Sequence, residues 1–343
     1  MKILIADTIL DKLDFTSDNC LNEIKDALKD HDARIVNFNN AVTALPNPVP
    51  TQPYRYSLID RNFMMAEYLE KYEKLFSPQL IIANDCVLSF ADLKTPAITV
   101  AQNMFSEMGK RLKDTHGIAI DYEMRIYDDL QKRQLLKSQA VALNRHISRI
   151  MGIEKIIETG IDIDFFNPDS GPKKYGGLKT GLWIGKFIPR YSFNFVSQLA
   201  KDFPKVQWIL VFEHDMDKDP KLPNVRIVKP NNLEELRSLY NAADFFINTN
   251  MIETNGINAL RAASCNVPVV VPRSGWFWDC SIGYQDIGHV ISKFEYQEFK
   301  SAVDSIVKEE YKYKPRQAIM DAKATRERFN EEWKDLIDKK LSI

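Results

Sequence analysis

Short apolar runs alternate with segments of helical periodicity along the chain. Most of these runs are almost continuous in Val, Ile, Leu, Phe and Ala, which is typical of strands buried on both faces of a parallel sheet. Strands that alternate with helices in this way predict doubly wound α/β sheets. The predicted strands are residues 2–6, 34–38, 79–83, 97–101, 140–143, 155–158, 180–184, 206–212, 225–228, 245–248, 267–271 and 289–291, and the predicted helices include 21–29, 62–75, 122–137, 193–201, 233–242 and 295–308.

The alternation is interrupted once, near the middle of the chain. Residues 167–177 read N-P-D-S-G-P-K-K-Y-G-G, and this density of proline and glycine is typical of an interdomain linker. A chain of 343 residues is also too long for one ordinary core. We therefore expect an N-terminal Rossmann-like domain at 1–168, a linker at 169–178, a C-terminal Rossmann-like domain at 179–314 and a final helical segment at 315–343.

The final segment is predicted to form one helix over residues 316–340. Phe329, Trp333, Leu336 and Ile337 recur in it at helical spacing. They make one apolar stripe on an otherwise charged helix. We expect this stripe to dock on the body of the protein.

Composition and charge narrow the function classes. Basic and acidic residues nearly balance, for a formal net charge of −1, so the chain has no bulk electrostatic footprint for nucleic acid or an anionic membrane. The five histidines show no metal-ligand spacing, and we expect no bound metal. The first apolar run stops at Asp7 and no run approaches the ~20 residues of a membrane span, so we expect a cytoplasmic protein without a transmembrane segment. The cysteines form no C-x-x-C pair and indicate free thiols; they are Cys20, Cys86, Cys265 and Cys280.

The most informative stretch is 244–272, which reads D-F-F-I-N-T-N-M-I-E-T-N-G-I-N-A-L-R-A-A-S-C-N-V-P-V-V-V-P. An apolar strand leads into a polar loop with Glu253 and Gly256, followed by a helix of small residues and a second buried strand. The pattern predicts a loop that presents a carboxylate and backbone N–H groups at the carboxyl edge of a parallel sheet. Polar ligands of α/β proteins bind at this edge. The plainer alternative is that Glu253 only caps the helix.

A second stretch, 183–193, reads W-I-G-K-F-I-P-R-Y-S-F. A strand ends at Gly185, and Lys186 and Arg190 follow on the loop into the next helix. Two cations at a strand end, beside a helix N-terminus, can stabilise negative charge that develops on a phosphate leaving group. The alternative is that both are solvated surface cations.

Taken in order, these stretches resemble the donor-binding half of the retaining glycosyltransferase family with GT-B architecture. That family has an acid, a glycine-containing turn and a second Glu eight positions after the first; Glu253 matches the acid, whereas Arg261 stands at the second position. A helix that ends in Tyr-x-x-Ala-Asp is matched by Tyr240, Ala243 and Asp244. The resemblance implies an α/β GT-B fold, with two Rossmann-like parallel-sheet domains facing a cleft and the C-terminal helix crossing back to the N-terminal domain.

The resemblance also implies roles for the site residues. Glu253 would orient the donor sugar, and Lys186 and Arg190 would stabilise the leaving diphosphate. The implied reaction is a retaining, metal-independent hexosyl transfer from a nucleotide-diphosphate sugar, with a UDP-sugar favoured, to a hydroxyl of a glycan, lipid-linked saccharide or small molecule. No cofactor is implied. The residues expected to bind the donor are Gly185, Lys229, Asn232, Asn255, Gly256, Ile257, Asn258 and Arg261.

Two alternatives stay open. A phage-type GT-B transferase that glycosylates modified DNA bases would need a basic N-terminal cleft, to which Lys110, Arg111 and Lys113 could contribute, so nucleic acid remains a candidate partner. A catalytically inactive GT-B binding module is the other, because Arg261 stands in place of an acid. Arginine has no acceptor for ribose hydroxyls. Arg261 would therefore pair with Glu253, touch phosphate or mark altered donor use.

Overall fold

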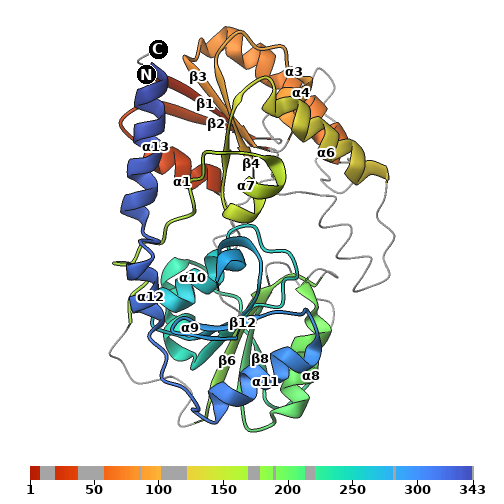
Figure 1. Ribbon diagram of the computed structural model, residues 1–343, viewed down its shortest axis with the longest axis vertical. Coiled ribbons are helices and arrows are strands. Elements are labelled where there is room, and N and C mark those ends of the chain that lie inside the picture. Colours follow the sequence, from red (N-terminus) through yellow and green to blue (C-terminus); the bar gives the residue numbers. More distant parts are fainter. Residues whose placement is uncertain are drawn as a thin grey trace. The chain divides into compact units, whose positions relative to one another are not determined.

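The computed structural model describes residues 1–7, 20–37, 58–84, 86–101, 122–168, 178–187, 191–212, 221–280 and 283–341. These residues form two compact α/β units, each built around its own sheet (Figure 1). The first unit takes the described residues up to Glu158 and the last helix from Phe329 onward. The second unit runs from Thr159 to Arg328.

The first unit contains a five-stranded parallel sheet in the order β2-β1-β3-β4-β5. Side chains alternate between its two faces, as the pleat requires. Ile3 and Ile5 pack toward one face, whereas Leu4 and Ala6 pack toward the other. Both sets are buried, which explains why these strands read as continuous apolar runs. The strands are β1 (Lys2–Asp7), β2 (Asp32–Asn37), β3 (Leu80–Asn84), β4 (Ala97–Ala101) and β5 (Gln139–Ala142).

Helices cover both faces of this sheet. On one face α1 (Cys20–Ala27) and α13 (Arg326–Leu341) share a core with the strands, and on the other α3 (Leu58–Phe76) and α4 (Val87–Phe90) do so. Outside α4 lies α6 (Tyr122–Leu135), whose Gln134 accepts a hydrogen bond of 2.8 Å from the backbone N–H of Leu88. The short helix α7 (Arg145–Met151) begins at Asn144, whose side chain accepts from the backbone N–H of Ile147.

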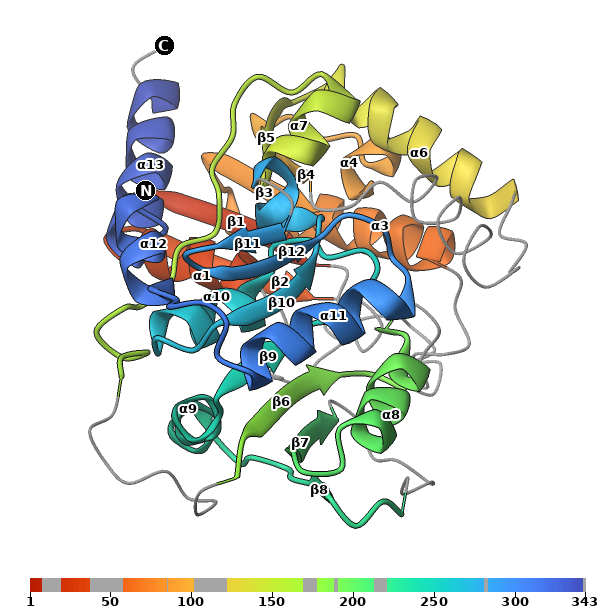
Figure 2. The ribbon, with the colours of Figure 1, turned by 60° about the horizontal axis from the view of Figure 1, so that its bottom comes forward.

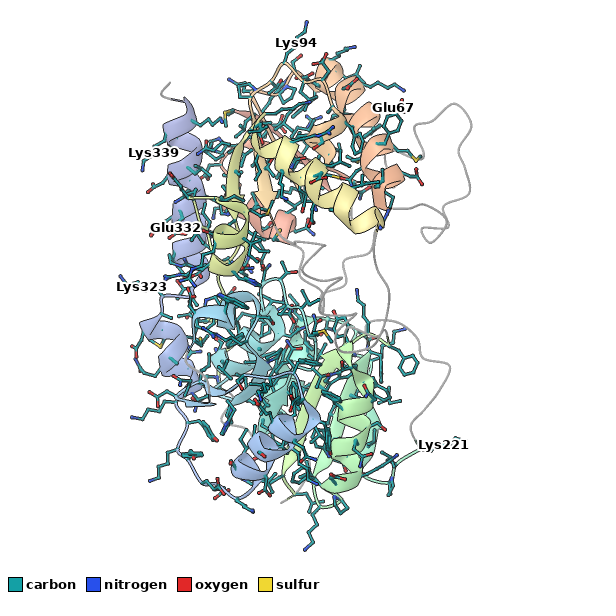
Figure 3. All side chains as sticks on the ribbon, turned by 45° about the vertical axis from the view of Figure 1, so that its right-hand side comes forward. Glu67, Lys94, Lys221, Lys323, Glu332 and Lys339 are labelled. Atoms are coloured by element: carbon teal, nitrogen blue, oxygen red, sulfur yellow. The ribbon has the colours of Figure 1, made fainter. Side chains whose placement is uncertain are left out.

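The last helix packs on the first unit through the predicted stripe. Phe329, Trp333 and Ile337 are fully buried among the strands, and Leu336 is nearly so. Lys339 is exposed at the outer edge of α13 (Figure 3). The expected crossing of the C-terminal helix is confirmed.

The prediction of one continuous helix over 316–340 is wrong. Helix α12 (Pro315–Asp321) ends first, and α13 begins after a break in which Lys323 takes a left-handed φ of 51°. The chain in the break pairs with Ile161, which donates to Ala324 O and accepts from Arg326 N at 3.0 and 2.9 Å. A side chain at Gly160 would place Cβ 2.1 Å from the carbonyl oxygen of Thr325. Because residues 324–326 pair with Ile161 in an extended conformation, they cannot continue the helix.

The second unit contains a seven-stranded sheet in the order β11-β12-β10-β9-β6-β7-β8. All strands are parallel except β11, which pairs with β12 in the antiparallel sense. Since β6, β9 and β10 are adjacent, their carboxyl ends meet at one edge. The strands are β6 (Thr180–Gly185), β7 (Gln207–Phe212), β8 (Val225–Ile227), β9 (Phe245–Ile247), β10 (Val269–Pro272), β11 (Gly283–Gln285) and β12 (Gly288–Ile291).

Helices again cover both faces. Figure 2 shows α9 and α10 on one side of β6, and α8 and α11 on the other. The first pair shares its core with Leu182 and Phe246, and the second pair with Trp183 and Phe245. The helices are α8 (Phe193–Asp202), α9 (Leu233–Ala242), α10 (Ile257–Ser264) and α11 (Tyr296–Val307), and a 3-10 helix, η3, spans Gly275–Asp279.

Two further sequence-based predictions need correction. Residues 155–158 do not form a strand: only Ile156 bridges Ala142, because Ala142 N donates to Lys155 O and Ile157 N donates back to Ala142 O before the chain enters the second unit. Strand β11 was not predicted, since Gly-Tyr-Gln has no apolar run. The remaining predicted strands and helices are present, with ends displaced by a few residues.

Candidate functional site

Three loops meet at the carboxyl edge of the second unit's sheet. Lys186 follows β6, residues 248–256 follow β9, and Arg273 to Gly275 follow β10. The strands are hydrogen-bonded neighbours, so the loops lie side by side. This is the edge at which parallel sheets bind ligands.

Glu253 lies on the middle loop with its carboxylate held on one side. Its Oε2 accepts hydrogen bonds from Asn248 Nδ2 at 2.7 Å and from Asn250 Nδ2 at 3.2 Å. Its Oε1 has no hydrogen-bond partner among the described residues and is not buried. The carboxylate therefore presents one acceptor oxygen in a fixed direction. Its backbone N–H donates to Ser274 Oγ at 3.3 Å.

The loop after β10 packs against the backbone of Glu253. Gly275 has a left-handed φ of 56°, and a Cβ there would lie 2.9 Å from the carbonyl oxygen of Glu253 and 3.0 Å from that of Thr254. Only glycine fits so close to the neighbouring backbone. The ring of Phe277 then lies near Gly256, where a Cβ would approach it to 3.0 Å.

Helix α10 begins beside Glu253. Its N-cap, Gly256, has a φ of 77° and offers no side chain to bond the first backbone N–H groups. Ile257 buries its side chain in the core, so its contribution at this edge is its backbone. The uncapped N-terminus of a helix favours an anion such as phosphate.

Asn255 is an additional polar group at this helix start. Its side chain is 3% exposed, and its Oδ1 has no hydrogen-bond partner among the described residues. A buried amide oxygen without a partner costs free energy, typically about 1–3 kcal/mol. A bound ligand or a water molecule is one way in which such a group can be satisfied.

Arg261 lies on the same helix, and its side chain packs against other residues of the second unit. Its side chain is 8% exposed, its guanidinium carbon lies 5.2 Å from the centroid of the Phe166 ring, and Nη1 lies 3.5 Å from Asn258 Oδ1. The same Asn258 oxygen accepts from the hydroxyl of Tyr240 at 3.0 Å, which joins α9 to α10. Two of the predicted donor-binding side chains, Asn258 and Arg261, are thus bonded to each other.

Aromatic rings pack closely against the end of β6. A Cβ at Gly185 would lie 2.5 Å from the rings of Trp183 and Tyr191, so glycine allows these rings to approach the strand end. Lys186 follows directly and is half-buried. Arg190 lies outside the described residues.

The loop expected near the nucleotide base follows β8. Lys229 is exposed there. Asn232 is the N-cap of α9, and its Oδ1 accepts from the backbone N–H of Glu235 at 2.8 Å. The side chain of Asn232 therefore caps the helix.

Sequence reasoning missed the side chains that hold the site together. Asn248, Thr249, Asn250 and Ser274 were not singled out, although each contacts either Glu253 or the loop after β6. The available signal was N-T-N between a buried strand and an acid, since asparagine side chains commonly organise turns.

No three His, Cys, Asp or Glu side chains in the described ranges lie together in a way that would hold a metal ion. None of the helices that the structure describes has the length and apolarity to cross a membrane.

Solved structures share this two-unit architecture at low sequence identity. Sucrose-phosphate synthase from Thermosynechococcus elongatus has a TM-score of 0.80 at 13% identity, with 100% of each chain covered. HepE from Anabaena in complex with UDP-glucose has a TM-score of 0.69 at 14% identity, covering 99% of this chain and 100% of HepE. An α,α-trehalose-phosphate synthase (UDP-forming) from Burkholderia xenovorans, in complex with glucose-6-phosphate, has a TM-score of 0.68 at 11% identity, with 100% of each chain covered.

These likenesses establish the fold, which is the GT-B fold that the sequence predicted. No protein-family model and no curated protein matches the sequence.

Proposed function

We propose that this protein is a glycosyltransferase that moves a sugar from a nucleotide-diphosphate donor to a hydroxyl acceptor. The donor binds at the carboxyl edge of the second unit's sheet. One observation carries the proposal: the carboxylate of Glu253, held by Asn248 and Asn250, stands beside the uncapped N-terminus of α10. A donor sugar nucleotide needs both an acceptor for sugar hydroxyls and donors for phosphate oxygens.

The reaction separates a diphosphate from the anomeric carbon of the sugar. Negative charge grows on the leaving diphosphate as that bond breaks, and groups aimed at that charge lower the barrier. In the proposal this charge meets Lys186, Arg190 and the backbone N–H groups of Asn255 to Asn258. Glu253 Oε1 accepts hydrogen bonds from the sugar and orients it.

A UDP-hexose is the favoured donor. The supporting observation is that HepE is similar to this chain over its whole length and is described in complex with UDP-glucose. The resemblance of the Glu253 loop to retaining enzymes supports retention of the anomeric configuration. We propose that side-chain cations and helix N–H groups, rather than a divalent ion, balance the diphosphate charge.

The acceptor hydroxyl, of a glycan, lipid-linked saccharide or small molecule, is assigned to the first unit, as the resemblance implies. The cytoplasm is the proposed location, because none of the four cysteines, all of which the structure describes, forms a disulfide. No observation favours DNA as the acceptor, since Lys110, Arg111 and Lys113 lie outside the described residues.

The direct experiment is turnover of a panel of UDP-, GDP- and ADP-hexoses, with the free nucleotide measured in the presence and absence of an acceptor library. We expect the wild-type protein to release the nucleotide from one kind of donor in this panel, at a rate that EDTA does not lower. We expect Glu253→Ala to lose this turnover. The anomeric configuration of the product, measured by NMR, tests retention. Absence of turnover for every donor, or turnover unaffected by Glu253→Ala, contradicts the proposal.

A further inference from the structure

We propose that the turn Asn248–Thr249–Asn250, here called the N-T-N turn, positions two parts of the donor site at once. Its asparagines aim the carboxylate of Glu253, and its threonine bonds to Trp183 and Tyr191, which stand on either side of Lys186 in the chain. The inference rests on the proposed function for its kinetic consequences, whereas its structural part can be tested without turnover.

The two asparagines act on one carboxylate oxygen. Both side-chain amides donate to Glu253 Oε2, at 2.7 Å from Asn248 and 3.2 Å from Asn250. Two donors on the same oxygen restrict rotation of the carboxylate, because rotation would break both bonds. Oε1 is therefore held toward the ligand side without any protein group bonded to it among the described residues.

The turn that carries these amides is itself rigid. The backbone N–H of Asn248 donates to Val270 O at 2.8 Å, which ties the turn to β10. The backbone N–H of Asn250 donates to the Oδ1 of Asn248 at 2.8 Å, so the same side chain shapes the turn and holds Glu253. All three residues of the turn are buried. Because the turn is buried and held by these two hydrogen bonds, its side-chain amides hold the carboxylate in a fixed position.

Thr249 faces the neighbouring loop. Its hydroxyl donates to the backbone carbonyl of Tyr191 at 2.5 Å and accepts from Trp183 Nε1 at 2.9 Å. Trp183 lies in β6 and Tyr191 just before α8, so the hydroxyl joins a residue that precedes Lys186 to one that follows it. One residue thus joins the carboxylate loop to the cation loop.

These two connections predict different kinetic defects. The asparagines act on the group that orients the sugar, where a misplacement of about 1 Å can cost roughly a hundredfold in rate. The threonine acts near Lys186, whose proposed partner, the diphosphate, already carries negative charge in the bound ground state and gains more in the transition state. Loss of the first should lower kcat, and loss of the second should weaken nucleotide binding.

Asn248→Asp removes the hydrogen bond that positions the Glu253 carboxylate and keeps the one that shapes the turn. The substitution keeps the Oδ1 that accepts from Asn250 N, and it replaces the amide that donates to Glu253 with a second carboxylate oxygen. We expect kcat to fall by about ten- to hundredfold while the donor KM changes little. Asn250→Asp should act in the same direction and more weakly, because its bond is longer.

Asn224→Asp is the matched control. Asn224 is half-buried in the same unit, immediately before β8, and its Nδ2 donates to the carbonyls of Ala200, Phe203 and Val206 at 2.8, 3.2 and 3.1 Å. The Asn224→Asp variant also loses amide donors, but at the amino edge of the sheet, opposite the candidate site. We expect it to lower the melting temperature and to leave kcat and the donor KM unchanged.

Thr249→Val removes the hydroxyl and keeps the shape of the side chain. We expect the Kd for UDP to rise by about two- to tenfold, the range for loss of one or two ordinary hydrogen bonds. The fall in kcat should be smaller than in Asn248→Asp. Equal effects of the two variants on kcat and Kd would contradict the division of roles.

A double-mutant cycle tests the carboxylate support without any turnover. Asn248→Asp places two carboxylates within hydrogen-bonding distance, and adding Glu253→Gln supplies an amide that can donate to the new carboxylate. We expect the melting temperature of the double variant to exceed that of Asn248→Asp. Additive effects on melting temperature would overturn the inference. If the wild-type protein turns over no nucleotide sugar, the proposed function fails while this cycle still decides whether the turn holds Glu253.

Discussion

The guanidinium of Arg261 lies 5.2 Å from the centroid of the Phe166 ring, and both residues are buried in the second unit. The ring belongs to the segment that precedes residue 168, and Ser264 Oγ, on the same helix as Arg261, donates to the backbone carbonyl of Phe166. Arg261 therefore anchors α10 to this segment. Its cationic head is used in packing, whereas the sequence resemblance assigned this position to nucleotide binding.

Arg261→Glu should destabilise the second unit. A carboxylate would face the negative π-face of Phe166 and the acceptor oxygen of Asn258, in place of a cation that both attract. We expect a loss of about 1–3 kcal/mol in the free energy of unfolding, measured by urea titration. Arg261→Met keeps the apolar stem and should lose less, and greater loss in Arg261→Met than in Arg261→Glu would show that the charge has no part in this packing.

Gly256→Ala and Gly275→Ala should both destabilise the protein, and the second should do so more. Each position has a positive φ, which costs an alanine about 1–2 kcal/mol. At Gly256 the new Cβ meets the Phe277 ring at 3.0 Å, and that ring can move. At Gly275 it meets the backbone carbonyl of Glu253 at 2.9 Å, which cannot move without shifting the site. The order of the two unfolding free energies checks this account, and the reverse order would contradict it.

His289 should make stability depend on pH. Burial lowers the pKa of His289 below its ordinary value of 6.5, with Glu310 opposing that shift, and its Nε2 lies 2.7 Å from the hydroxyl of Tyr313. The unfolded chain therefore binds a proton that the folded chain does not, in the range from pH 6.5 down to the folded pKa. The stability is fully present above pH 6.5 and is lost as pH falls through this window. His289→Gln should flatten that part of a plot of melting temperature against pH, and an unchanged slope would argue against it.

Cys265 should resist alkylation. Burial raises the pKa of its thiol to about 12, so almost no thiolate is present at pH 8. Cys280 is only half-buried and should react first. Mass spectrometry after brief iodoacetamide treatment of the native protein, with peptide mapping, distinguishes the two, and faster modification of Cys265 would contradict its burial.

The sequence predicted the sheets well because their strands are buried on both faces. The strand at 97–101 has the same bounds in the structure, and Ile98 and Val100 are fully buried. Local periodicity could not show where a tertiary contact interrupts a helix. The break before α13 depends on Ile161, which is more than 150 residues away in sequence and pairs with Ala324 and Arg326.

Part of the candidate site was predictable because it follows directly on a buried strand. A strand followed by an acid and a glycine marks a carboxyl-edge loop, and Glu253 and Gly256 lie on such a loop. The partners of Glu253 were not predictable from composition, because three polar residues after a strand are also typical of a simple turn. The packing of Arg261 depends on Phe166, 95 positions earlier in the chain, and no local pattern indicates that contact.

We propose that the second unit binds a nucleotide diphosphate between Lys186 and the N-terminus of α10. The decisive measurement is a calorimetric titration of UDP into the wild-type protein and into Lys186→Ala, with Asn224→Asp as the control for general destabilisation. A charge-assisted hydrogen bond to phosphate contributes about 1.5–3 kcal/mol, which corresponds to roughly a ten- to hundredfold change in Kd. We expect saturable binding by the wild type and by Asn224→Asp, and a loss of affinity of this size in Lys186→Ala. Equal affinity in Lys186→Ala and the wild type, or no binding of UDP, GDP or ADP by the wild type, would contradict it.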